Sequence, residues 1–210
     1  MFKRNPLELG GKREIIGEGM TPNETRVFFA SLGKRILCFF GYSEDYQNPK
    51  AMHNIAKDVL AQYSPETSLV NAGATRGGIG GVYPIARAMG FLTTGIVSSL
   101  VIDYIDEISN AVDYVCIVSD TVWGGKLPNS NFLSPTSQAM VACSDVLIGI
   151  GGGEISRDEM VDGREQGKPV YFYPAEISHE RMISRARRMG LPEPESFWGA
   201  AHEVFSGTHY

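Results

Sequence analysis

Two glycine-rich segments are the residues of this chain whose types and spacing best fit a chemical role. The first separates an apolar run from a helix-like pattern and holds Gly77, Gly78, Gly80 and Gly81. The second has the same setting and holds Gly151, Gly152, Gly153 and Ser156. Glycine permits a tight turn and a close approach to backbone N–H groups, and a helix N-terminus favours negative charge. Two residues would suffice to shape a turn, so these segments predict a site for a nucleotide or a sugar phosphate.

Two charged residues accompany these turns. Arg76 precedes the first set of glycines and is either a solvated loop charge or a clamp for an anion, because a guanidinium can make paired hydrogen bonds. Glu159 follows Ser156 by three residues and shares its helix face. Its carboxylate either complements the helix dipole or acts on a ligand in front of the helix.

Further polar and aromatic residues are expected at the same edge of the sheet. Asp120 ends an apolar run, and the loop after it carries Trp123 and Lys126. Trp123 either stacks on a base or anchors a covering loop, and Lys126 is a candidate phosphate contact. Ser43 and Asn71 also end apolar runs, where they either contact a ligand or cap a turn.

The elements that position these residues alternate along the chain. Continuous apolar runs predict strands at 35–43, 68–72, 92–99, 114–119, 145–150 and 170–173. Helical patterns lie between them, including one that Ser134 and Pro135 begin and one at 178–189. This alternation predicts an α/β, Rossmann-like, doubly wound, mostly parallel sheet with helices on both faces, and a ligand at the carboxyl ends of its strands.

The chain divides into three expected parts. Residues 1–33 form an extended N-terminal arm with a short helix at 22–32, residues 34–190 form the Rossmann-like nucleotide-binding domain, and residues 191–210 form a tail packed on that domain. We find no internal repeat and no low-complexity linker.

Composition restricts the function classes. The 210 residues are 43% hydrophobic and 20% charged, with a net charge of −5, which argues against binding of duplex nucleic acid. The densest basic stretch, 181–188, is interpreted as a solvated helix face. Three cysteines in apolar runs and four scattered histidines predict neither disulfides nor a metal site, and no cofactor is implied. Without a long apolar segment or a signal-like start, we expect a cytoplasmic protein that is not bound to a membrane.

The glycine segments resemble those of a known family. Gly77–Gly81 is similar to the G-G-x-x-G-x-M-G-A turn of the lonely-guy proteins, once described as lysine decarboxylases. The segment 144–159 resembles their S-D-A-x-I-x-L-P-G-G-x-G-T-x-x-E motif. The wider Rossmann-like superfamily also holds molybdenum-cofactor carriers and DNA-processing protein A. The resemblance runs from about residue 35 to 173.

The resemblance implies a function and roles for individual residues. Lonely-guy enzymes hydrolyse the N-glycosidic bond of nucleoside 5′-monophosphates, releasing base and ribose 5-phosphate. Gly152 and Gly153 match their two glycines, Ser156 matches their phosphate-binding Thr, and Glu159 matches their catalytic Glu. The family is usually dimeric or larger, which implies a homo-oligomer.

The sequence also departs from the family pattern. Gly151 replaces its Pro and Ile155 replaces its last Gly. The helix at 134–143 lacks the family's catalytic Arg, for which Arg76 is the nearest substitute. The sequence therefore predicts a protein that binds a nucleotide or sugar phosphate and resembles the phosphoribohydrolases. The alternative is a non-catalytic nucleotide sensor or a carrier of a molybdopterin-type cofactor.

Overall fold

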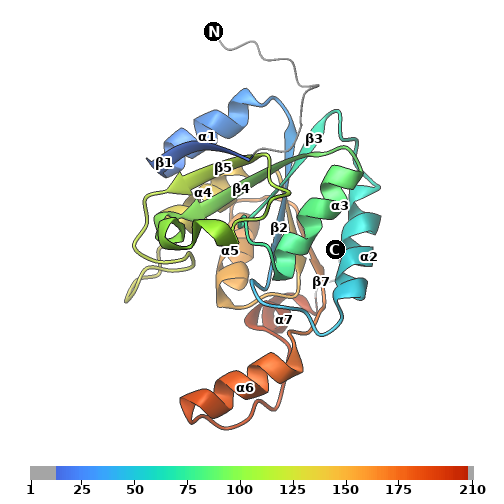
Figure 1. The fold of residues 1–210 in the computed structure, drawn as a ribbon, viewed down its shortest axis with the longest axis vertical. Coiled ribbons are helices and arrows are strands. Elements are labelled where there is room, and N and C mark those ends of the chain that lie inside the picture. Colours follow the sequence, from blue (N-terminus) through green and yellow to red (C-terminus); the bar gives the residue numbers. More distant parts are fainter. Residues whose placement is uncertain (1–12, 208–210) are drawn as a thin grey trace.

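The computed structural model describes residues 13–207 (Figure 1). Seven strands form one sheet in the order β1-β5-β4-β3-β2-β6-β7, and every neighbouring pair is parallel. The strands are β1 (Glu14–Met20), β2 (Arg35–Gly41), β3 (Ser68–Ala72), β4 (Leu92–Ser98), β5 (Tyr114–Val118), β6 (Val146–Ile150) and β7 (Val170–Tyr173). The predicted doubly wound α/β class is confirmed.

Helices follow the strands and cover both faces of the sheet (Figure 1). The α-helices are α1 (Pro22–Ser31), α2 (Pro49–Leu60), α3 (Val82–Ala88), α4 (Pro135–Cys143), α5 (Glu154–Glu165), α6 (His179–Met189) and α7 (Ala200–Phe205). Two 3₁₀ segments, η1 (Gly78–Gly81) and η2 (Ser99–Glu107), follow β3 and β4.

Two apolar cores lie on opposite faces of the sheet because successive strand residues point to opposite sides. Leu37 and Phe39 of β2 pack into the core under α2 and α3. The residues on either side of them, such as Cys38 and Phe40, pack into the core beneath α1, α4, α5 and α7. Every residue of β3 is buried, as expected for a strand covered on both sides.

Local sequence signals explain several boundaries. Thr21 and Glu24 form a capping box that begins α1, with the Glu24 N–H donating to Thr21 Oγ1 at 3.2 Å. Asn48 accepts a bond from the Ala51 N–H at the start of α2. Gly190 ends α6 in a left-handed conformation.

Near both ends of the described chain, the structure has elements that were not predicted from the sequence. Residues 14–20, expected in an extended arm, form the edge strand β1, which pairs with β5. The short helix expected after them is present as α1. In the expected tail, Ala200–Phe205 form α7, and its Phe205 is buried in the second core.

Candidate functional site

The candidate site is a cavity of about 810 Å³ at the carboxyl ends of the central strands. Within the sheet, β3, β4 and β5 follow one another on one side of β2, and β6 lies on the other side of β2. The residues after β2 and β6 both line the cavity, which therefore lies where the winding of the sheet reverses. Ligands of open α/β sheets bind at this position. We call it the switch-point cavity.

The start of α5 forms one wall of this cavity. Gly153, the N-cap residue, lines the cavity, and no side chain among the described residues caps the helix. The first intrahelical bond runs from the Arg157 N–H to the Gly153 carbonyl, so the Glu154, Ile155 and Ser156 amides precede it. These amides and the positive end of the helix dipole favour an anion in front of the helix.

The glycines before α5 make this arrangement possible. Gly151 and Gly152 have φ values of +57° and +129°. A Cβ on Gly151 would lie 2.6 Å from the Tyr42 ring, and one on Gly152 would lie 2.7 Å from Ser156 Cβ. Gly153 has open space where its side chain would stand. The second turn therefore combines two glycines required by close packing with one that faces the cavity.

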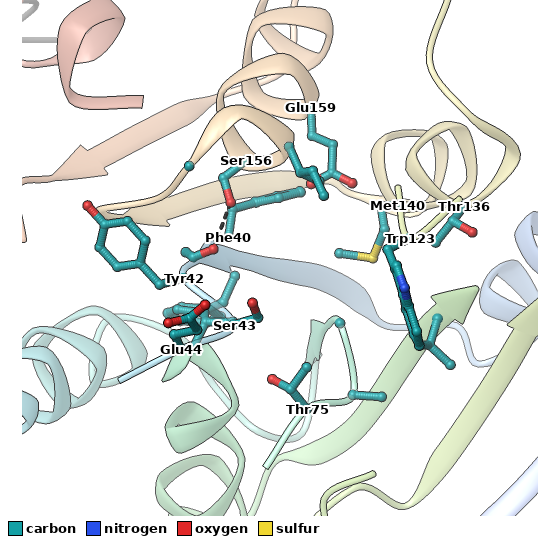
Figure 2. A pocket seen from close by; sticks show the side chains of 18 of the residues that line it. Phe40, Tyr42, Ser43, Glu44, Thr75, Trp123, Thr136, Met140, Ser156 and Glu159 are labelled. Atoms are coloured by element: carbon teal, nitrogen blue, oxygen red, sulfur yellow. Dashed lines mark hydrogen bonds between the residues drawn. The ribbon is translucent and has the colours of Figure 1, made fainter. Parts of the chain in front are cut away.

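The Ser156 hydroxyl has a protein partner. Ser156 lines the cavity but is 5% exposed, and its Oγ donates to the Gly41 carbonyl at 2.8 Å. This bond attaches the first turn of α5 to the end of β2 (Figure 2). The backbone amide of Ser156 remains at the helix N-terminus. The Ser156 hydroxyl, which the sequence predicts to bind a phosphate, donates its proton to the Gly41 carbonyl instead.

The first glycine turn contributes the side chain of Ile79 to the cavity, but not its glycines. None of its four glycines, Gly77, Gly78, Gly80 and Gly81, lines the cavity. The turn lies against the loop after β2: the Ile79 N–H donates to the Tyr42 carbonyl at 2.7 Å. Gly78 has φ +55°, and a Cβ there would meet the Tyr42 and Glu44 carbonyls. A Cβ on Gly80 would meet the Thr75 carbonyl. These glycines allow two loops to pack backbone to backbone.

Arg76 is not among the residues that line the cavity. Its Nε donates to the Ile108 carbonyl at 3.2 Å. Arg185 of α6 lines the cavity instead, and it is the one lysine or arginine of residues 13–207 that does so. No sequence signal marks Arg185, because a basic helix face is typical of a solvated surface.

Glu159 is buried in the cavity wall and is bonded to a residue of α4. It is 5% exposed, and Ser137 Oγ donates to its Oε1 at 2.6 Å. The Gly125 N–H donates to the same hydroxyl at 2.7 Å. Burial raises the pKa of Glu159 to about 8, although the Ser137 hydrogen bond opposes this shift. At neutral pH the carboxyl is therefore mainly protonated and able to donate a hydrogen bond. Ser137 was not singled out from the sequence.

Two aromatic side chains form part of the cavity lining. Trp123 and Tyr104 both line the cavity, are 51% and 57% exposed, and have ring centroids 5.9 Å apart. Figure 2 shows Trp123 and Met140 on one side of the cavity, and Tyr42 and Ser156 on the other. Exposed aromatic rings beside a cavity are suited to contact with a planar ligand group.

Four further residues named from the sequence have different positions. Ser43 lines the cavity. Asn71 is fully buried, with its amide nitrogen 3.2 Å from Cys38 Sγ. Asp120 accepts the Thr136 N–H at 2.8 Å in the first turn of α4. Lys126 is 3.8 Å from Asp158 in an ion pair. Asn71, Asp120 and Lys126 are thus held in protein contacts outside the cavity lining.

The described residues, 13–207, show neither a metal-binding cluster nor a helix that could span a membrane. No group of three or more histidine, cysteine, aspartate or glutamate side chains in this range is arranged to hold a metal ion. Across the same range, each helix is too short or too polar to cross a bilayer.

Comparisons with known proteins concern the fold. No protein-family model and no curated protein matches the sequence. Among solved structures, the chain is similar to the Moco carrier protein of Chlamydomonas reinhardtii, at 23% identity and TM-score 0.48, covering 67% of this chain and 76% of that one. The molybdenum cofactor binding protein of Rippkaea orientalis gives 23% identity and TM-score 0.48, covering 66% and 76%.

DNA processing protein A of Streptococcus pneumoniae is also similar, at 14% identity and TM-score 0.46, covering 85% of this chain and 63% of that one. At these identities the likeness concerns the fold alone.

Proposed function

We propose that this protein binds a nucleotide, or another sugar phosphate that carries a planar ring, in the switch-point cavity. The observation that carries the proposal is that the uncapped N-terminus of α5 forms a wall of this cavity. A cavity of about 810 Å³ is of the size that holds small organic ligands, which usually occupy roughly 300–1,000 Å³.

The two sides of the cavity suit the two ends of such a ligand. The phosphate would accept bonds from the amides at the start of α5, near Ser156. The planar ring would lie near Trp123, beside the apolar side chain of Met140 (Figure 2). Glu159 is linked to α4 through Ser137, and Figure 2 shows it between these two sides, where the sugar would lie.

The carboxyl of Glu159 favours a second function, hydrolysis of the N-glycosidic bond. In this reaction water adds to the anomeric carbon while the bond to the base breaks, and the base takes up a proton. A carboxyl with a pKa of about 8 is protonated at neutral pH, and could donate a proton to the departing base. Arg76 has no part in this proposal, because it is not among the residues that line the cavity and its Nε donates to the Ile108 carbonyl.

The test is a panel of nucleoside 5′-monophosphates, with binding measured by calorimetry and released base by chromatography. We expect binding by the wild-type protein and, if it is a hydrolase, base release that is lost in Glu159→Gln. Glu165→Gln is the matched control, because Glu165 is an exposed carboxylate on the same helix.

The outcomes separate the possibilities. Binding without release would make the protein a sensor or a carrier. A pterin-type cofactor recovered by mass spectrometry from the denatured protein would identify it as a carrier. If no nucleotide of the panel binds and no small molecule is recovered, the proposed function is wrong.

A further inference from the structure

Arg185 lies between two hollows of the surface. It lines the switch-point cavity and also a polar hollow beside α6, and Glu44 lines both as well. Arg185 belongs to α6, which projects from the body of the molecule (Figure 1). Its side chain is 59% exposed, so it has room to move toward either hollow.

The contact that holds Arg185 is a loose one. Its Nη1 lies 3.7 Å from Glu44 Oε1, which is an ion pair beyond hydrogen-bonding distance. An exposed pair of this kind contributes little to stability, so an incoming anion can replace one of its members.

Other bonds attach α6 to the loop after β2. Arg181, one turn before Arg185, lies 3.0 Å from Asp45, and the Ser178 N–H donates to the Asp45 carbonyl at 2.9 Å. The His179 N–H donates to Gln47 Oε1 at 2.9 Å. Arg185 is therefore not required to keep α6 in place.

The charges around the cavity make Arg185 important to an anionic ligand. Apart from Arg185, the lysine, arginine, aspartate and glutamate side chains of residues 13–207 that line the cavity are all carboxyl groups: Glu44, Glu107, Glu154 and Glu159. Glu44 follows β2, whose last residue, Gly41, accepts the Ser156 hydroxyl bond at the start of α5. Arg185 thus lies at the side of the cavity that carries the helix N-terminus.

We propose that Arg185 binds the anionic group of the ligand in the switch-point cavity, and that Glu44 competes with the ligand for it. On binding, the guanidinium leaves the Glu44 carboxylate and forms charge-assisted hydrogen bonds to the ligand anion. Glu44 then sets the affinity by holding Arg185 when no ligand is bound. This inference rests on the proposed function of the cavity.

The experiment compares matched variants by calorimetry, with adenosine 5′-monophosphate, ribose 5-phosphate and adenosine as probes. Arg185→Ala is expected to weaken binding of both phosphates about tenfold and to leave adenosine binding unchanged within twofold. Arg181→Ala is the control, because Arg181 lies on the same helix and pairs with Asp45 outside the cavity lining. It should change phosphate binding less than twofold.

Glu44→Gln tests the competition. It is expected to tighten ribose 5-phosphate binding roughly threefold in the wild-type background and much less in Arg185→Ala. Equal gains in the two backgrounds would mean that Glu44 only repels the ligand, and would overturn the exchange.

The failure of this inference is distinguishable from that of the proposed function. If the wild type binds the phosphates and Arg185→Ala binds them equally well, Arg185 has no role but the cavity keeps its function. If neither phosphate nor any other member of the nucleotide panel binds the wild type, and no small molecule is recovered from the denatured protein, both proposals fail. Thermal unfolding of each variant confirms that it is folded.

Discussion

Ser137 Oγ donates a hydrogen bond of 2.6 Å to Glu159 Oε1 and accepts one of 2.7 Å from the Gly125 N–H. One hydroxyl thereby joins α4, α5 and the loop before α4. Because its proton is directed at Oε1, the other oxygen of Glu159 is the one left to carry the carboxyl proton. Ser137 orients the acid of the cavity.

Replacing this hydroxyl changes the acidity of Glu159. The hydrogen bond from Ser137 lowers the pKa that burial has raised. Ser137→Ala should therefore raise the pKa above about 8, by roughly one to two units, since a hydrogen bond to a charged group is worth about 1.5–3 kcal/mol. Carboxyl ¹³C NMR titration of the glutamates measures it. Gln138→Ala, at the exposed next residue of α4, should leave the titration unchanged. An unshifted Glu159 in Ser137→Ala would contradict the role of this bond.

The raised pKa also makes stability depend on pH. The pKa of Glu159 has its ordinary value of 4.5 in the unfolded chain and is about 8 in the folded protein. Between these two pH values the folded protein therefore binds a proton that the unfolded chain has lost. The free energy of unfolding should fall as pH rises through this window, by about 1.4 kcal/mol per unit for this one group. In Glu159→Gln this contribution is absent. The free energy of unfolding of both proteins is measured with urea at pH 5.5, 6.5 and 7.5. It should fall more steeply with pH in the wild type than in Glu159→Gln; equal slopes would show that the carboxyl titrates normally.

The aromatic side of the cavity should affect the base and not the phosphate. Trp123→Ala is expected to weaken binding of adenosine 5′-monophosphate by about 1–3 kcal/mol, the usual contribution of base stacking, and to leave ribose 5-phosphate binding within twofold of wild type. Phe132→Ala is the control, because Phe132 is 77% exposed in the same loop and lies outside the cavity lining. Equal losses of affinity for both ligands in Trp123→Ala would mean that the base does not bind beside Trp123.

The first glycine turn should tolerate a methyl group at one position and not at its neighbour. Gly78 has φ +55°, and its Cβ would lie 2.6 Å from the Glu44 carbonyl, so Gly78→Ala should lower the free energy of unfolding by roughly 2 kcal/mol or more. Gly77 has φ −91° and its Cβ would lie 3.6 Å from the Ser43 carbonyl, an ordinary contact. Gly77→Ala should cost less than about 1 kcal/mol. Chemical unfolding measures the free energy of unfolding of both variants. Similar losses of stability would show that close packing does not require glycine at position 78.

The elements of the central sheet were predictable because strong local signals mark them. The bounds of β3 and β7 agree with the predicted runs, and α4 begins at Pro135 as expected. By contrast, β1 contains two glycines and is mostly half-exposed, so it has no apolar run of the kind that marks a buried strand. The short helix α7 follows a proline-rich stretch and depends on its contacts with the sheet.

The candidate site was predictable only in part. The second glycine turn and Glu159 lie at the cavity because the order of strand, turn and helix determines where a helix begins. Ser137 and Arg185 depend on how α4 and α6 pack, which the local sequence does not determine. The first glycine turn looks like an anion-binding loop in sequence, yet its glycines serve contact with a neighbouring loop.

The pairing of β1 with β5 has a consequence for how the chain folds. Glu14 of β1 pairs with Tyr114 of β5, so β1 is synthesised long before the strand with which it pairs. Such non-local pairing slows folding and leaves unpaired strand edges exposed in the interval. A truncated chain that begins after α1 would leave β5 as an open edge, and the resulting molecule would be prone to aggregate through that edge.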